Sequence, residues 1–196
     1  MRTRNADKEE LVRQNAIDML VKDGFQDFSM NRLAKESGIS VATLYIYYQD
    51  KDDLIKKIGV AIGNNFFAEM LKDFSAAMPF KEGLKKQWEN RARVALAHPK
   101  EAACYEIIRH SSHGEYILKE SLKDFKFAMG DFFHNAVKRK ELVPVSVEVF
   151  WSVAYGPLYT LLRFHGEGKS IGGMPFKFSK KTMDEAFELV IKALTP

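Results

Sequence analysis

The sequence of 196 residues predicts an all-α protein. Apolar residues recur at helical spacing through almost the whole chain, and glycines and prolines end most of these runs. No segment alternates apolar and polar residues in the way of a half-buried strand. We therefore expect about nine helices, with a three-helix domain at the N-terminus and a helical domain after it.

The first expected helix has its apolar positions over residues 11–20 and ends at Gly24. Ser29 can cap a short second helix that ends at Gly38, Ser40 can cap a third, and Asp50 can cap a fourth. This fourth helix is expected over residues 51–78, because its apolar stripe continues until Pro79. Five more helical patterns follow, over residues 82–97, 100–112, 115–140, 145–165 and 180–194.

The composition is that of an ordinary folded protein, with 46% hydrophobic and 29% charged residues. No apolar stretch approaches the roughly 20 residues that a membrane helix needs, and no secretory signal precedes the first helix. The single cysteine, Cys104, cannot form an intramolecular disulfide. We therefore expect a cytoplasmic protein without membrane contact. The net charge of +4 permits an anionic partner, but residues 1–58 hold ten basic and ten acidic residues, so bulk charge does not identify one.

The third expected helix carries too many bulky residues for one core. Four of them, residues 45–48 (Tyr-Ile-Tyr-Tyr), are consecutive and must point around the whole helix. Leu44 and Tyr48 lie one turn apart and can face the first helix. An outward face of apolar and hydroxyl groups suits the DNA major groove, where it can contact thymine methyls, base edges and phosphates. The alternative is that these tyrosines bury a small three-helix core. The residues expected to point outward are Val41, Ala42, Thr43, Tyr45, Ile46 and Tyr47.

Residues 16–54 resemble the DNA-binding domain of the TetR/AcrR transcriptional regulators. The segment AIDMLVKDGFQDFSMNRLAKESGISVATLYIYYQDKDDL matches the family pattern A-x-x-x-G-[VI]-S-x-x-x-[LI]-Y-x-[YH]-[FY]-x-x-K-x-x-L. The resemblance implies that Ser29 and Lys51 contact the DNA backbone and that Tyr47 contacts a phosphate. It places Thr43 and Tyr45 in or beside the groove, and Val41 and Ala42 at the variable positions that read bases. The predicted DNA-binding set is Ser29, Ser40, Val41, Ala42, Thr43, Tyr45, Tyr47 and Lys51.

The resemblance further implies a division into a DNA-binding domain, residues 1–50, and an effector-binding and dimerisation domain, residues 51–196, linked by the helix over 51–78. Residues 147–165 are apolar nearly all round, which favours burial on two sides. We expect a homodimer through helices 145–165 and 180–194. The alternative is an ordinary monomer core. The last helix has a matching apolar stripe of Met183, Ala186, Phe187, Val190, Ile191 and Leu194.

A small-molecule effector of unknown identity is expected between the fourth helix and those after it. Most of the aromatic residues there can equally be plain core. The predicted ligand-binding set is Phe66, Phe67, Trp88, Tyr105, His110, Phe125, Phe132 and Trp151.

These features together predict a DNA-binding transcriptional regulator: a homodimeric repressor that binds a palindromic operator in double-stranded DNA and is released by a small apolar or amphipathic ligand. We expect no enzymatic activity, no cofactor and no metal, because neither GEGKS (residues 166–170) nor Glu106, His110 and His113 complete a known site. One alternative is a helical ligand-binding or enzymatic bundle that does not bind DNA. The other is a protein-interaction module that uses the aromatic surface of the third helix.

Overall fold

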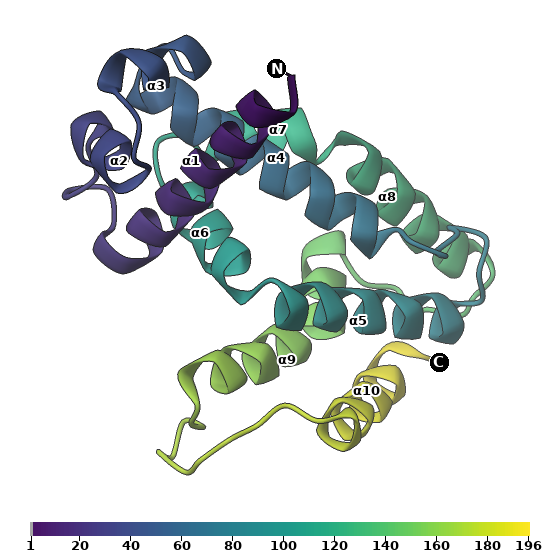
Figure 1. The fold of residues 1–196 in the computed structure, drawn as a ribbon. Coiled ribbons are helices and arrows are strands. Elements are labelled where there is room, and N and C mark those ends of the chain that lie inside the picture. The colour runs from purple at the N-terminus through teal and green to yellow at the C-terminus, as the bar shows by residue number, and fades with distance from the viewer. Residues whose placement is uncertain (1) are drawn as a thin grey trace. The chain divides into compact units, whose positions relative to one another are not determined.

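The computed structural model describes the backbone of residues 2–196 and the side chains from Asp7 onward, and it confirms the all-α class (Figure 1). Within this range, extended pairing is limited to an isolated bridge between Lys169 and Pro175. The helices are α1 (Arg2–Asp23), α2 (Met30–Glu36), α3 (Val41–Tyr47), α4 (Lys51–Met70), α5 (Phe80–Ala97), α6 (Pro99–Arg109), α7 (Gly114–Ser121), α8 (Lys123–Lys138), α9 (Val147–Glu167) and α10 (Lys180–Leu194).

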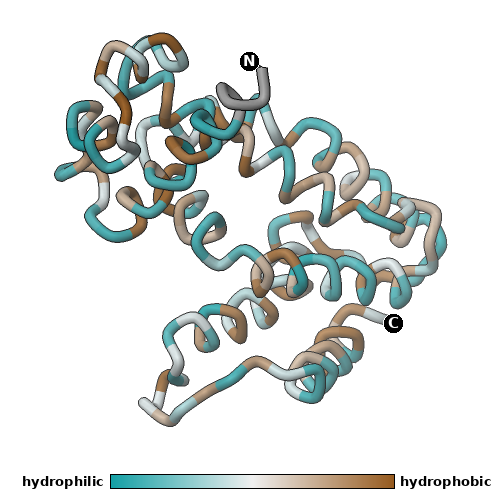
Figure 2. Tube along the Cα trace, viewed as in Figure 1, coloured by the Kyte–Doolittle hydropathy of each residue, from teal (hydrophilic) through white to brown (hydrophobic). Residues whose placement is uncertain are grey.

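Apolar and polar residues are interspersed along the helices (Figure 2). A helix with one buried face requires such a mixture, with the apolar residues at helical spacing. Among the described residues, no helix combines the length and the hydropathy that crossing a membrane demands. The residues that these helices bury are mainly apolar.

The chain forms two compact units, which are described separately. The first contains residues 1–66 and 98–123, and the second contains residues 67–97 and 124–196. These units are defined by the contacts within the chain. The predicted boundary at residue 50 separates a DNA-binding domain from an effector-binding domain, and it stays a prediction.

In the first unit, α1 provides the centre of the core. Its residues Val12, Ile17 and Leu20 are fully buried, and α2 and α3 add Leu33 and Leu44, which are also inaccessible to solvent. α1 packs on both α2 and α6, and α2 packs on α3. The three N-terminal helices thus pack on one another and, through α1, on α6 within the first unit.

In the second unit, the core is aromatic and joins α5, α8, α9 and α10. The indole Nε1 of Trp88 on α5 donates to the Ala154 carbonyl oxygen of α9 at 2.7 Å, and its ring meets Phe187 of α10 edge-on at 5.4 Å. Phe132 of α8 packs against Phe80 at 5.9 Å between ring centroids. Because the indole N–H has an acceptor, this tryptophan is buried without an unsatisfied donor.

The prediction that the fourth helix continues to residue 78 is wrong, since α4 ends at Met70. Side chains of α5 take the carbonyl groups that a longer helix would use: Gln87 Nε2 donates to the Met70 oxygen at 2.8 Å, and Asn90 Nδ2 donates to the Lys72 oxygen at 2.7 Å. Asp73 then adopts a left-handed conformation with φ of 53°. Apolar spacing alone could not reveal this termination.

The expected single helix over residues 115–140 is two helices, α7 and α8, so that residues 2–196 contain ten helices and not nine. The break follows Ser121, which is buried and whose Oγ donates to the Ile117 carbonyl oxygen at 2.7 Å. A serine that bonds back to the preceding turn competes with the helical hydrogen bonds and favours a bend.

Candidate DNA-binding site

Helices α2 and α3 are joined by a turn that depends on Gly38. Gly38 has φ of 63°, and its N–H donates to the Lys35 oxygen at 3.1 Å, while the Ile39 N–H donates to the Ala34 oxygen at 3.0 Å. This pair of bonds is the Schellman motif, which requires a left-handed residue just after the helix and therefore favours glycine. The turn sets the direction in which α3 leaves α2.

The two predicted capping serines begin these helices. Ser29 Oγ accepts from the Arg32 N–H at 3.3 Å, and Ser40 Oγ accepts from the Thr43 N–H at 3.0 Å. Ser40 Oγ and Thr43 Oγ1 also lie 2.8 Å apart in a hydrogen bond. Both serines are exposed, so each is accessible to a partner as well as acting as a cap.

One face of α3 is buried and the other is open to solvent. Leu44 is fully buried and Tyr48, directly after the helix, is 4% exposed, whereas Tyr45 is 51% and Ile46 78% exposed. Burial raises the pKa of Tyr48 to about 12, as expected for a phenol packed against α1. The prediction that the helix exposes apolar and aromatic groups is confirmed for Tyr45, Ile46 and Ala42; the side chains of Val41, Thr43 and Tyr47 are half-buried.

Lys51 has a structural role that its position in the motif did not reveal. Its Nζ donates to the carbonyl oxygens of Phe25 and Phe28, at 2.8 and 3.0 Å, and lies 5.6 Å from the centroid of the Phe28 ring. These contacts tie the start of α4 to the loop between α1 and α2. The predicted contact of Lys51 with DNA stays a prediction, and any phosphate would share an ammonium group that already holds this loop.

Replacing Lys51 by methionine is therefore expected to lower the free energy of unfolding by about 1–3 kcal/mol, because the part-buried carbonyl oxygens of Phe25 and Phe28 lose a charged donor. Urea unfolding followed by circular dichroism measures this loss. The control is Lys35→Met, since Lys35 is exposed on α2. An unchanged stability for Lys51→Met would contradict the structural role.

Two further side chains position α3, and sequence reasoning missed them. Lys57 Nζ donates to the Tyr47 carbonyl oxygen at 3.1 Å and lies 5.4 Å from the Tyr48 ring centroid. Asn15 Nδ2 on α1 donates to Ser37 Oγ at 3.1 Å, next to the turn. Neither contact follows from local spacing, because the partners are separated by 10 and 22 residues.

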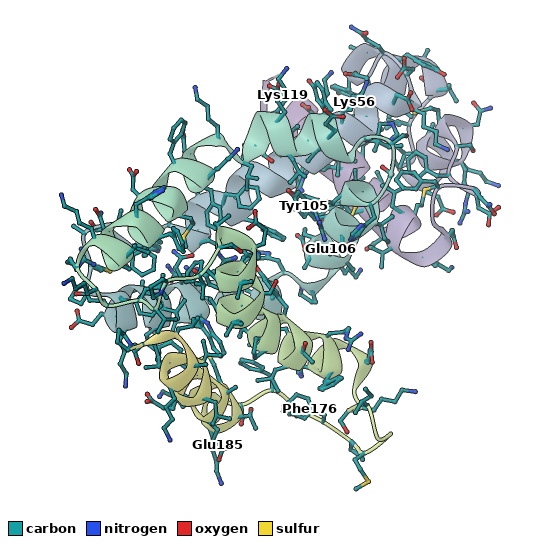
Figure 3. All side chains as sticks on the ribbon, turned by 180° about the vertical axis from the view of Figure 1, so that it is seen from behind. Lys56, Tyr105, Glu106, Lys119, Phe176 and Glu185 are labelled. Atoms are coloured by element: carbon teal, nitrogen blue, oxygen red, sulfur yellow. The ribbon has the colours of Figure 1, made fainter. Side chains whose placement is uncertain are left out.

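The predicted ligand-binding residues fall into both units. Phe66, Tyr105 and His110 belong to the first, in which Tyr105 lies on α6 (Figure 3) and its ring centroid is 6.2 Å from that of Phe66. His110 is exposed, beside Glu106, and does not contribute to a buried wall. The other five belong to the second unit: Phe67, Trp88, Phe125, Phe132 and Trp151.

In the second unit, Trp88 and Phe132 are fully buried core residues, while the Phe67 ring is tilted against that of Phe125 with centroids 5.0 Å apart. A groove in this unit is lined by Lys85, Lys86 and Phe187 among others, and none of the predicted ligand-binding residues lines it. The assignment of the aromatic set to an effector stays a prediction.

Cys104 is a packed core residue, as the sequence reading expects. Its side chain is inaccessible to solvent, and burial raises the pKa of the thiol to about 12. The thiolate that a nucleophile or a metal ligand requires is therefore not formed near neutral pH.

The helix-turn-helix geometry and the exposed face of α3 define a DNA-binding protein of the helix-turn-helix class. Residues 12–58 match the bacterial regulatory proteins of the tetR family. The chain is 25% identical to an HTH-type transcriptional regulator of Haemophilus influenzae over 87% of this chain and 88% of that protein. It is 37% identical to an HTH-type regulator of Staphylococcus aureus over 28% of this chain and 29% of the relative.

Solved structures agree in fold over nearly the whole chain. A TetR family transcription regulator from Marinobacter aquaeolei superposes with a TM-score of 0.80 at 22% identity, covering 99% of this chain and 98% of the other. A TetR-family regulator from Haemophilus influenzae has a TM-score of 0.73 at 21% identity, with 97% and 98% covered.

Residues 12–58 therefore carry the DNA-binding domain of the tetR family of bacterial regulatory proteins, and the chain as a whole has the fold of TetR-family regulators. The relatives are transcriptional regulators, which agrees with the class of protein that the sequence predicts. The alternative of a helical bundle without a DNA-binding domain is therefore not supported.

Proposed function

We propose that this regulator is a homodimeric repressor that binds a palindromic operator through α3 and leaves it when a small apolar or amphipathic effector binds. The observation that carries the proposal is the exposed face of α3. An aromatic side chain and an isoleucine that are 51% and 78% exposed have no role in the core of the first unit. In the major groove, by contrast, Tyr45 and Ile46 can contact thymine methyl groups and base edges.

A dimer through α9 and α10 would place two α3 helices on the same duplex. Half-sites one helical turn apart, about 34–36 Å, then require a two-fold symmetric protein. The apolar stripe of α10 that was predicted for this interface packs inside the chain instead. Its residues Met183, Phe187, Val190, Ile191 and Leu194 are buried in the chain's own core. Only Ala186 of that stripe remains partly exposed.

Other residues of these two helices support the proposed interface. On α10, a stripe at helical spacing points outward and includes Leu189, which is 67% exposed. On α9, the outward positions Ser152, Gly156 and Thr160 follow one another at four-residue steps, so that a second helix can approach closely. The outward stripe of α10 is Thr182, Ala186, Leu189 and Ala193.

Replacing Gly156 by glutamate is expected to dissociate the proposed dimer. A Cβ at this position meets nothing within 4 Å in the chain itself, so the added side chain affects only what packs on α9 from outside. A carboxylate in an apolar interface costs several kcal/mol when it has no partner, which shifts a stable dimer to monomer. Light scattering coupled to gel filtration measures the mass.

The matched control is Gly130→Glu on α8, which also has open space around its Cβ but lies outside the proposed interface. A wild-type protein that is monomeric at the concentration at which it binds DNA, or a Gly156→Glu variant that stays dimeric, would contradict the proposed interface.

The experiment that tests the function as a whole is selection of bound sequences from a random pool of double-stranded DNA. The expected result is a consensus of two inverted half-sites, each read by one α3. Failure to enrich any sequence contradicts operator binding, and enrichment of an asymmetric single site contradicts the symmetric dimer.

Release by an effector requires that the effector binds one conformation more tightly than the other. Shifting the population from 1:99 to 99:1 takes about 5.5 kcal/mol of differential affinity. We propose α4 as the connecting element, because this one helix begins in the first unit at Lys51, which holds the loop between α1 and α2, and ends at Met70 in the second unit.

A further inference from the structure

Arg91 of α5 is a buried cation in the second unit. It is 2% exposed, and the carbon of its guanidinium group lies 4.0 Å from the ring centroid of Tyr155. The rings of Phe125 and Trp151 are each 5.1 Å from the same carbon, and that of Tyr159 is 5.8 Å away. Aromatic faces attract a guanidinium through their quadrupoles, and four of them surround this one.

The hydrogen bonds of Arg91 satisfy only part of its guanidinium group. Nη1 donates to the Tyr159 hydroxyl at 2.5 Å. Nε and Nη2 are buried and have no hydrogen-bond partner. These two nitrogens lie on the same edge of the planar group, the edge whose parallel N–H bonds match the two oxygens of a carboxylate.

In the described part of the chain, Arg91 forms no ion pair with an acidic side chain, so no carboxylate neutralises its charge. Arginine does not lose its proton in proteins, so burial cannot remove the charge as it can for lysine. A buried charge whose donors have no acceptor is costly, and proteins usually supply a partner. The unsatisfied edge is therefore the feature that needs a ligand.

We propose that the Nε–Nη2 edge of Arg91 binds the carboxylate of a small acid with an apolar body. This inference rests on the proposed function, because it assigns the chemical class of the effector. The anion supplies the two missing acceptors, and the rings of Phe125 and Trp151 beside the guanidinium accommodate a hydrocarbon or aromatic body. A neutral ligand of the same shape would leave the guanidinium charge unpaired.

A second polar group faces the same place. The Tyr155 hydroxyl is buried and is not in hydrogen-bonding geometry with any partner, although the guanidinium of Arg91 is near it. Burial raises the pKa of Tyr155 to about 12, and the positive charge of Arg91 opposes this effect. The hydroxyl is therefore protonated at neutral pH and can donate to a bound oxyanion.

Two of the rings around the guanidinium, those of Trp151 and Tyr159, are partly exposed. Trp151 and Tyr159 are 39% and 41% exposed, so a change of rotamer in either ring can admit a ligand. Together with Tyr155 they follow at four-residue steps on one face of α9. Gly156 lies about 100° further round the helix, so the proposed dimer contact and the proposed entrance use different faces.

The test measures binding of acids and their neutral counterparts to the full-length protein. Octanoate and phenylacetate are compared with octanamide and phenylacetamide by calorimetry. For the wild type, we expect each acid to bind about tenfold or more tightly than its amide. In Arg91→Gln this preference disappears, because the acid loses about 10- to 100-fold in affinity while the amide changes little.

Two further variants keep the result interpretable. Arg91→Lys retains the charge without the two parallel donors, so its affinity for the acids is expected to fall about tenfold. This variant tests the inference if Arg91→Gln does not fold. Arg93→Gln is the matched control, since Arg93 lies on the same helix, is exposed and pairs with Glu69 at 2.5 Å. We expect it to bind the acids like the wild type.

The inference is overturned if the wild type binds neither acid at millimolar concentration, if the amides bind as well as the acids, or if Arg91→Gln keeps the preference. Inorganic phosphate binding more tightly than either acid would also overturn it, because it would indicate a general anion site. Operator binding is measured separately without ligand. Its absence contradicts the proposed function, whereas intact operator binding with no acid preference contradicts only the role of Arg91.

Discussion

Replacing Tyr45 by alanine is expected to weaken binding to the selected operator by about tenfold or more, since a good contact with a base contributes about 1–3 kcal/mol. Tyr45 is 51% exposed on α3, so its removal is expected to change the free energy of unfolding by less than about 0.5 kcal/mol. Fluorescence anisotropy with labelled operator measures the affinity. The salt dependence should keep its slope, because the phenol carries no charge that displaces counterions from DNA.

The control for this prediction is Phe127→Ala, which removes another exposed aromatic ring, 66% accessible, from α8 in the second unit. It is expected to leave operator affinity unchanged. Tyr47→Ala tests the predicted phosphate contact in the same assay. If both tyrosine variants bind the operator like the wild type, the exposed face of α3 is not the surface that reads DNA.

The local features of the DNA-binding domain were predictable because each depends on a few neighbouring residues. Ser29 and Ser40 cap their helices through N–H groups three residues away, and Gly38 takes the left-handed conformation that its turn requires. The inward position of Leu44 and the outward position of Tyr45 follow from helical geometry. For such features, the sequence alone contains the necessary information.

Features that depend on contacts between distant segments were not predictable. The ammonium group of Lys51 is held by carbonyl oxygens 23 and 26 residues earlier in the chain, and no spacing rule relates them. Arg91 is an unremarkable residue in a charged helix until the rings of α8 and α9 surround it. The end of α4 at Met70 is set by side chains of α5 in the same way.

The same distinction explains the outcome for the predicted effector site. The predicted set rests on residue type, and type does not separate the wall of a cavity from a packed core: Trp88 and Phe132 are fully buried among their neighbours. What points to a ligand is an unsatisfied polar group inside an aromatic cluster, which only the three-dimensional contacts of Arg91 reveal. A buried polar group without a hydrogen-bond partner therefore indicates an effector site more specifically than a high content of aromatic residues does.

Replacing Gly114 by alanine is expected to destabilise the first unit by about 3 kcal/mol, the upper part of the range for overpacking. A Cβ on Gly114 would lie 2.0 Å from the Arg109 carbonyl oxygen and 2.9 Å from its carbonyl carbon. Because these are backbone atoms, no change of rotamer relieves the overlap, and the turn between α6 and α7 must move.

That turn also carries His113, so the displacement is expected to reach the DNA-binding helices. The His113 ring stacks on Phe25 with centroids 6.1 Å apart, and its Nε2 lies 3.1 Å from Asp52 Oδ1 at the start of α4. We therefore expect Gly114→Ala to reduce operator affinity as well as the urea midpoint. Gly130→Ala, in open space within α8, is the control and should stabilise the protein by about 0.5–1 kcal/mol through helix propensity. Equal stability of the two alanine variants would show that the α6–α7 turn tolerates the added methyl group and does not constrain the DNA-binding helices.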